Sequence, residues 1–487
     1  MKVKRVEKNI QTGAAEVLGI LSYETAPEKV CLESLSGVTL EDCRRFIISE
    51  NFRAKAGSTV KIPLSVDGLK YVVVAGLGKE EEADEDKVRA AVFSIVRAAA
   101  ERACETVLLR APGAEGAMRS RAVAEGAVLG SYRFDKYMKR DGDDRFSPVQ
   151  SVMVQDGDEQ ALRQGEIFAE CQVYARDLAN EPGNVINPVT LSCRAAALAE
   201  EVGLECEVWD EKRIVEEKMG AFYAVGQGSA NPPRFIRLTW TPGGKPEGHT
   251  VLIGKGITFD SGGLDIKPAD YMVTMKGDKS GACAVLGAIR AAALLKLPRK
   301  VTAIIAAAEN MPGGAAYRPD DILTARNGKT IEINNTDAEG RLTLADALAF
   351  ASELKPDCIV DIATLTGACA VALGSTTAGL FSCDDELAGR LLAASRSSGE
   401  MLWRLPMNDP NLRKQIKSQV ADIVNCGSRY GGAITAAMFL EEFVEKGIPW
   451  AHIDIAAADF IKEPYSYYVK GASGFGMRTL AAFLAVQ

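Results

Sequence analysis

The densest group of ionisable residues is the run Asn335-Thr336-Asp337-Ala338-Glu339-Gly340-Arg341-Leu342. Asp337 and Glu339 are two positions apart, so their side chains point the same way if the run is extended. Two carboxylates that face one spot repel each other unless a cation lies between them. Arg341 falls near the start of the next helix, where backbone N–H groups favour an anion. The run therefore predicts a cation site beside an anion-binding group; the structural alternative is a charged loop with a capping carboxylate.

A second candidate site follows the apolar run at 250–254, which predicts a buried strand. Lys255 and Asp260 lie in the glycine-rich segment after it, where the sites of open α/β sheets are found. Glycines in such a turn let the backbone pass close to a ligand. The segment is not a phosphate-binding Walker loop, because His249 and Gly256 break that motif. Its structural alternative is a solvated turn.

Three other residues each have a plain structural interpretation. Lys267 alone is typical of an exposed surface lysine. Asp278 lies just before an Ala- and Gly-rich helix, where Asp is a favoured N-cap. His452 lies in an apolar run and is expected to be a hydrogen-bonded core histidine. The segment 361–368 predicts a strand and a turn of small residues, on which a substrate wall can be built.

The chemistry follows from four carboxylates, those of Asp260, Asp278, Asp337 and Glu339. Hard oxygen ligands suit Mg²⁺, Mn²⁺ or Zn²⁺. Four carboxylates exceed the charge of one divalent ion, so two ions are expected, and paired ions lower the pKa of a shared water. The chain has only 2 histidines, which limits histidine-based triads and zinc motifs. The residues alone predict a two-metal hydrolase and leave peptide, ester and phosphate substrates open.

Composition narrows the class of protein. The chain has 487 residues, 47% hydrophobic and 25% charged, which predicts a globular protein of more than one domain. A net charge of -8 argues against nucleic acid as the main partner. No apolar run reaches about 18 residues, and no apolar region follows the basic start, so neither a membrane helix nor a secretory signal is expected. The 11 cysteines form no CxxC pair, which favours reduced thiols in the cytoplasm.

The elements that must position these residues alternate between strands and helices. This predicts an α/β fold of two domains, each a mixed or mainly parallel sheet with helices on both faces. Strands are expected at 71–75, 104–109, 250–254, 301–306, 331–334 and 358–363. Helices are expected at 86–103, 158–180, 281–295, 342–354, 433–446 and 476–485. The polar break at 140–150 suggests an N-terminal domain at 1–150, a linker and connecting helix at 151–180, and a C-terminal catalytic domain at 181–487.

The run 335–342 looks like the signature octapeptide of the leucyl (cytosol) aminopeptidase family. Segments 254–263, 275–282, 361–368, 431–437 and 471–476 resemble the same family in the same order. The resemblance is strong from about Ala175 onward. In the first 150 residues it is carried by 72–79 and 125–137, which resemble the family's macro-like N-terminal domain.

The resemblance implies a metallo-aminopeptidase that prefers leucine or other apolar N-terminal residues and assembles as a hexamer of two stacked trimers. It implies one metal on Asp260, Asp337 and Glu339. The second metal, Mn²⁺ or Zn²⁺ like the first, would be held by Lys255, Asp260, Asp278 and Glu339. A lysine ligand must be neutral, because only the free amine has a lone pair.

The implied mechanism uses a metal-bridging hydroxide that attacks the scissile carbonyl. Lys267 would stabilise the oxyanion, and Arg341 would hold a bicarbonate-like anion that moves a proton to the leaving amine. Asp278 would bind the substrate's free α-amine. Backbone groups at Leu365 and Gly367 would position the substrate, and two side chains would line its pocket, those of Met275 and Thr364.

Two positions depart from the family pattern. Lys279 stands after Asp278 where the family commonly has Met, so an extra cation either loosens the second metal, shifts the preferred ion, or points away at the start of the helix. Residue 457 is Ala where a glycine is usual after Asp454-Ile455-Ala456, which affects the shape of the pocket.

Two other functions compete with this interpretation. Some relatives double as DNA-binding regulators, but the basic run here, Lys136, Lys139, Arg140 and Arg145, is interrupted by Asp141, Asp143 and Asp144 and is typical of a solvated linker. A two-metal phosphoesterase fits the bare chemistry without motif support.

Overall fold

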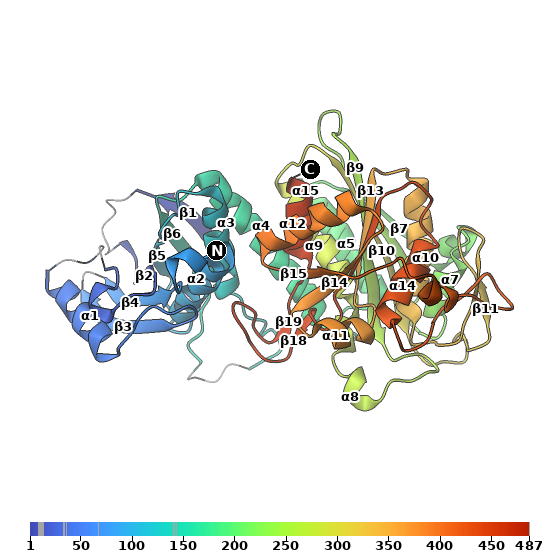
Figure 1. Cartoon of the computed structure of the whole chain (residues 1–487), viewed down its shortest axis with the longest axis horizontal. Helices are drawn as coiled ribbons and strands as arrows, with labels where there is room; N and C mark the ends of the chain where they lie inside the picture. The colour runs from blue at the N-terminus through green and yellow to red at the C-terminus, as the bar shows by residue number, and fades with distance from the viewer. Residues whose placement is uncertain are drawn as a thin grey trace. The chain divides into compact units, whose positions relative to one another are not determined.

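The computed structural model describes residues 1–487 except 8–13, 33–34, 36, 67, 140–141, 143 and 487. The chain forms two compact units (Figure 1). The first comprises Met1–Val173 and Glu463–Val469, and the second comprises Tyr174–Lys462 and Lys470–Gln487. Within the described residues, no helix combines the length and the apolar character needed to cross a membrane.

The first unit is built on a six-stranded sheet in the order β1-β6-β5-β2-β4-β3. All neighbours pair in parallel except β3 and β4, which are antiparallel. Its strands are β1 (Lys2–Val6), β2 (Val17–Ser22), β3 (Thr59–Val66), β4 (Leu69–Gly76), β5 (Thr106–Arg110) and β6 (Ser151–Gln155).

Helices cover both faces of this sheet, because its central strands are apolar on both sides. Successive residues of β4 alternate between two cores: Val72 belongs to one, and Val73 to the other. The core of Val72 includes α1 (Gly37–Ser49), and the core of Val73 includes α2 (Glu85–Ala100) and α3 (Ala117–Gly130).

The second unit has an eight-stranded sheet in the order β15-β14-β17-β13-β9-β10-β8-β7. The central pairs β17-β13, β13-β9 and β9-β10 are parallel, while β8 and β7 extend one side antiparallel. Its strands are β7 (Glu205–Trp209), β8 (Arg234–Trp240), β9 (His249–Asp260), β10 (Lys300–Asn310), β13 (Cys358–Ala363), β14 (Thr377–Phe381), β15 (Met401–Arg404) and β17 (Trp450–Asp454).

Two helix layers enclose the second sheet. Val251 and Ile253 of β9 share a core with α7 (Gly220–Gly226), α10 (Glu339–Glu353) and α14 (Gly432–Glu441). The intervening Gly254 faces α9 (Ser280–Leu294), which packs beside α5 (Pro188–Val202) and α15 (Met477–Ala485). The predicted fold class, two α/β domains with mixed, mainly parallel sheets, is confirmed.

Most predicted elements exist, with shifted ends. The strand expected at 358–363 is β13 without change, while those at 250–254 and 301–306 extend to Asp260 and Asn310 as β9 and β10. The helix expected at 158–180 is α4 (Glu159–Asn180). Strand β6 falls within the segment predicted as linker, yet it pairs with β1 and β5 in the first sheet. Arg140, Asp141 and Asp143 of the predicted break lie outside the described residues.

Candidate metal centre

The site forms where neighbouring parallel strands end at different heights. β13 stops at Ala363, one residue beyond the pairing of Ile362 with Gly254, whereas β9 continues to Asp260. β10 runs beside β9 over this length, and its last residue, Asn310, pairs with Asp260, the last residue of β9. The side chains of Lys255 and Asp260 therefore project near the carboxyl edge of the sheet, where ligands bind in such folds.

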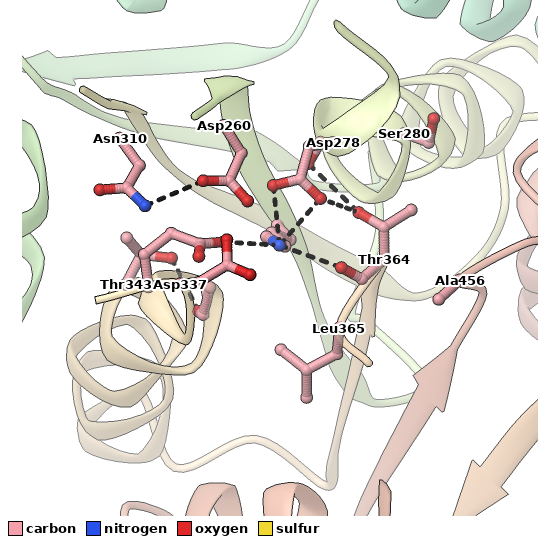
Figure 2. A network of polar contacts seen from close by, with 12 residues as sticks. Asp260, Asp278, Ser280, Asn310, Asp337, Thr343, Thr364, Leu365 and Ala456 are labelled. Carbon is pink, nitrogen blue, oxygen red and sulfur yellow. Dashed lines mark hydrogen bonds and ion pairs between the residues drawn. The ribbon is translucent and has the colours of Figure 1, made fainter. Parts of the chain in front are cut away.

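Three carboxylates gather there. Asp260, Asp337 and Glu339 each offer an oxygen within 4.8 Å of the others, and Figure 2 shows Asp260, Asp278 and Asp337 around a common space. Burial raises the pKa of the carboxyls of Asp260, Asp337 and Glu339, and the neighbouring carboxylates raise it further. Buried Glu339 Oε2 has no hydrogen-bond donor within the described part of the chain. These features fit a divalent cation.

The signature run is not extended between its two carboxylates. Asp337 lies in a turn, and Glu339 is the first residue of α10. The two carboxylates still converge because the chain bends at Ala338, whose φ and ψ are -112° and 40°. Arg341 lies in the first turn of α10, as predicted.

Lys255 lies at the centre of a charged network. Its Nζ is 2.8 Å from Asp278 Oδ1 and 2.8 Å from Glu339 Oε1, and it donates to the Thr364 carbonyl at 3.0 Å. Burial would lower the pKa of this amine, but the carboxylates of Asp278, Glu339 and Asp260 outweigh burial and raise it. These carboxylates therefore favour the ammonium form of Lys255 when no cation lies between them.

Asp278 does not cap α9. The N-cap residue is Lys279, without a side-chain cap bond. The Asp278 carboxylate instead accepts from Lys255 and from Thr364 Oγ1, the latter at 2.7 Å (Figure 2). Burial raises the pKa of this carboxyl, and the charge of Asp260 adds to the effect.

Lys267 is not a surface lysine. Only 14% of its side chain is exposed, and its Nζ forms ion pairs with Asp260 Oδ2, at 2.7 Å, and with Asp337. Burial opposes the charge, but Asp260, Glu339 and Asp337 together raise the pKa of Lys267. Two ammonium groups thus face four carboxylates, which leaves net negative charge for cations to balance.

Arg341 is buried and donates from Nη1 to the Asn425 carbonyl at 2.7 Å. Burial lowers its pKa, and Glu339 partly opposes that effect. No carboxylate of the described residues lies within ion-pair distance of it. A buried guanidinium without a carboxylate partner suits a small anion.

The predicted substrate residues surround this network. Thr364 and Leu365 follow β13, and the Leu365 N–H donates to Asp454 Oδ1 at 3.1 Å. Gly367 is exposed at the first turn of α11 (Gly367–Leu373). Half-buried Met275 begins the 3₁₀ turn η4 (Met275–Lys279), which carries Asp278.

Sequence reasoning missed Asn310 and Thr336. Asn310 Nδ2 donates to Asp260 Oδ1 at 2.8 Å and to the Thr336 carbonyl at 3.0 Å, which orients the Asp260 carboxylate (Figure 2). Thr336 Oγ1 donates to the Gly262 carbonyl at 2.7 Å. The signal for Asn310 was its place at the end of a strand adjacent to β9.

The two departures from the family pattern have clear structures. Lys279 is buried and points away from the carboxylates, toward backbone carbonyls. Ala457 adopts a φ of 70°, a left-handed conformation that glycine takes without strain.

His452 is a core residue, as predicted. Its Nδ1 lies 2.6 Å from Asp361 Oδ1, and its ring stacks on Phe381 with centroids 5.6 Å apart. It is not among the residues of the carboxylate cluster.

The geometry defines a class: a two-domain α/β protein with a buried carboxylate–lysine cluster at the carboxyl edge of its larger sheet. The profile of the catalytic domain of the cytosol aminopeptidase family matches residues 173–481, and that of its N-terminal domain matches residues 27–141.

Similar proteins agree over the whole length. A probable cytosol aminopeptidase of Aquifex aeolicus (strain VF5) is 52% identical over 99% of this chain and 98% of its own. Bottromycin maturation enzyme BotP, solved in complex with Mn, has a TM-score of 0.86 at 40% identity, covering 97% of this chain and 99% of its own. A mutant of tomato leucine aminopeptidase has a TM-score of 0.89 at 32% identity, covering 100% of this chain and 97% of its own.

The chain belongs to the cytosol aminopeptidase family. It is a metal-dependent aminopeptidase, a hydrolase that acts on peptides. Membership of the family confirms the resemblance seen in the sequence. It also selects peptides from the peptide, ester and phosphate substrates that the residues alone left open.

Proposed function

We propose that the enzyme releases N-terminal residues, preferably leucine or other apolar residues, with the help of two divalent ions, Mn²⁺ or Zn²⁺. The observation that carries the proposal is the excess of four carboxylates over two ammonium groups in one buried cluster. Lys255 must lose its proton to bind a metal, and the four carboxylates then face a single ammonium, so their net negative charge exceeds that of one divalent ion.

The ligand sets follow the two halves of the cluster. One ion would bind Asp260, Asp337 and Glu339, whose oxygens already lie within 4.8 Å of one another. The other would bind Asp260, Glu339, Asp278 and Lys255. When bound, the ions supply an activated water and polarise the scissile carbonyl, which is the bridging-hydroxide chemistry predicted from the sequence.

The chain's own residues would divide the remaining work. Asp278 would accept a hydrogen bond from the free α-amine, because its carboxylate lies in the cluster, where it already accepts from the Lys255 ammonium and the Thr364 hydroxyl (Figure 2). That contact requires an unblocked N-terminus. Lys267 would stabilise the developing oxyanion, since its ammonium is held at the edge of the cluster by Asp260 and Asp337.

Arg341 would hold a bicarbonate-like anion that carries a proton to the leaving amine. Support comes from the burial of Arg341 near the metal centre, where its guanidinium feels the charge of Glu339 but forms no ion pair with a described carboxylate. The pocket for the first side chain would be lined by Met275 and Thr364, while the backbone at Leu365 and Gly367 would align the peptide.

At the level of assembly, we propose a homohexamer in the cytoplasm. The support is the resemblance to the family and the names of the relatives, which are called cytosol aminopeptidases.

The test uses chelator-stripped protein assayed on leucine amide, with Mn²⁺ or Zn²⁺ added back. N-acetylated leucine amide controls for the free amine. Asp337→Ala removes a proposed ligand, and Asp385→Ala is the matched control, because the Asp385 side chain is 89% exposed.

We expect metal to restore cleavage of the free-amine substrate only. Asp337→Ala should lose it and Asp385→Ala keep it. Cleavage of the acetylated substrate at an equal rate would refute the assigned role of Asp278, and full activity of Asp337→Ala would refute the ligand set.

A further inference from the structure

The ammonium of Lys279 is enclosed by backbone carbonyls. The residue is fully buried, with no exposed surface. Its Nζ donates to the carbonyls of Glu181, at 2.9 Å, and Ala179, at 3.4 Å, and also to that of Lys276. A buried ammonium with three donors is well matched by three carbonyl acceptors.

Two of these acceptors lie at the C-terminal end of α4, which runs to Asn180. The last carbonyls of a helix receive no hydrogen bond from N–H groups within the helix, and they lie at the negative end of its dipole, so cations bind well there. Lys276 adds a second tether, from its Nζ to the Asn180 carbonyl at 2.6 Å. Two lysines of η4 thus hold one helix end.

That helix end is itself fixed on its other side. Asn180 Oδ1 accepts from the Ala472 N–H at 2.9 Å, and Arg176 Nε donates to the Ala472 carbonyl at 2.8 Å. A Cβ at Gly471 would lie 2.7 Å from Asn180 Oδ1, so the strand β19 (Gly471–Ala472) approaches closely. The carbonyl cage is therefore a rigid anchor.

The anchored turn carries Asp278. Its carboxylate faces Lys255 and Thr364, while the next side chain along the chain, that of Lys279, points into the cage. The start of α9 has no side-chain cap. We propose that Lys279 is a positioning residue, whose ammonium ties η4 to the end of α4 and so sets the place of the Asp278 carboxylate for metal and for the substrate amine.

This inference rests on the proposed function, because it assumes that Asp278 is a ligand. Lys279→Met keeps the length of the side chain but removes its three N–H donors. The hydrogen bonds to the carbonyls of Ala179, Glu181 and Lys276 are then lost. Groups that orient a metal ligand typically change metal affinity by roughly 10- to 100-fold. We expect that loss at the site of Asp278 and Lys255 and a smaller change at the other.

The experiment titrates metal-free protein with Mn²⁺ by calorimetry and then measures leucine amide hydrolysis. Wild type is compared with Lys279→Met and with Lys212→Met, which replaces an exposed lysine of α6 (Glu211–Glu216). Unfolding temperature and circular dichroism establish that each variant is folded.

We expect Lys279→Met to bind Mn²⁺ more weakly at one site and to raise KM, while Lys212→Met behaves as wild type. Affinity and KM equal to wild type in folded Lys279→Met would overturn the inference and leave the proposed function standing. A wild-type protein that binds no Mn²⁺ would instead overturn the proposed function.

If Lys279→Met does not fold, Lys276→Met carries the test. Lys276 is half-buried and contributes one tether. Weaker Mn²⁺ binding in the same direction, by a smaller factor, is expected; unchanged binding would count against the positioning role.

Discussion

Lys255 and Lys267 lie in the same carboxylate cluster, yet the proposed mechanism needs them in opposite protonation states. Lys255 must lose its proton to become a ligand, whereas Lys267 must keep it to stabilise negative charge. In the metal-free chain the surrounding carboxylates raise the pKa of both. Metal binding must therefore displace the proton of Lys255.

This predicts proton release on metal binding. Because Lys255 is an ammonium at neutral pH, occupancy of its site should release about one more proton in wild type than in Lys255→Met. The sign follows from the raised pKa: lower pH favours the ammonium, so metal affinity should fall as pH falls. Calorimetry in two buffers with different ionisation enthalpies measures the release. Equal release in both proteins would exclude Lys255 as a ligand.

A second prediction concerns Lys267. Lys267→Met should lower kcat by about 10²- to 10³-fold, the usual cost of removing one oxyanion donor, with little change in KM. Steady-state kinetics on leucine amide at saturating Mn²⁺ measures it. A rise in KM with kcat unchanged would show instead that Lys267 binds the substrate before reaction.

At the scale of elements, the cluster depends on a close approach of α9 to β9 and β13. A Cβ on Gly281 would overlap the Ile362 carbonyl oxygen and lie 2.9 Å from the backbone nitrogen of Lys255. A Cβ on Gly254 would lie 2.5 Å from Ala282 Cα. These glycines let Asp278, just before α9, reach Lys255 on β9.

Gly281→Ala should therefore destabilise the protein by about 1–3 kcal/mol, as overpacking does. It should also weaken metal binding, because α9 must move away from Lys255. Gly389→Ala in α12 (Asp385–Ser398) is the control: a Cβ there meets nothing within 4 Å, so stability should rise by up to about 1 kcal/mol. Denaturant unfolding compares them. Equal effects would refute the close-packing argument.

The sequence predicted these elements better than their ends or their side-chain partners. β13 was predicted residue for residue because its apolar run is bounded by polar and small residues. The predicted strand at 301–306 was shorter than β10, because Glu309 and Asn310 at the end of β10 are polar although buried. The role of Asn310 was missed for the same reason. The burial of Lys267 and Lys279 arises from contacts between segments distant in the chain, which local patterns do not encode.

At the scale of the whole molecule, stability should depend on pH through His249, the first residue of β9. Its Nε2 lies 2.9 Å from Thr302 Oγ1, and burial, aided by the charge of Lys300, lowers its pKa to about 4. The unfolded chain has the ordinary value near 6.5 and so binds the proton first on acidification. Stability should therefore fall as pH drops from about 6.5 toward 4.

Denaturant unfolding of wild type and His249→Gln at pH 7.5 and pH 5 tests this. Other titrating groups are shared, so the wild type should lose more stability than the variant. Parallel losses would show that His249 is not responsible.

The first unit is not one continuous stretch of chain, because Glu463–Val469 belongs to it. Within it, the Tyr467 hydroxyl donates to Asp86 Oδ1 at 2.7 Å, and the Arg89 guanidinium lies over the Tyr467 ring. On the ribosome, residues 1–173 are made long before that segment emerges. The amino-terminal part of the enzyme can therefore complete its native contacts only near the end of translation, and a truncated gene product would lack them.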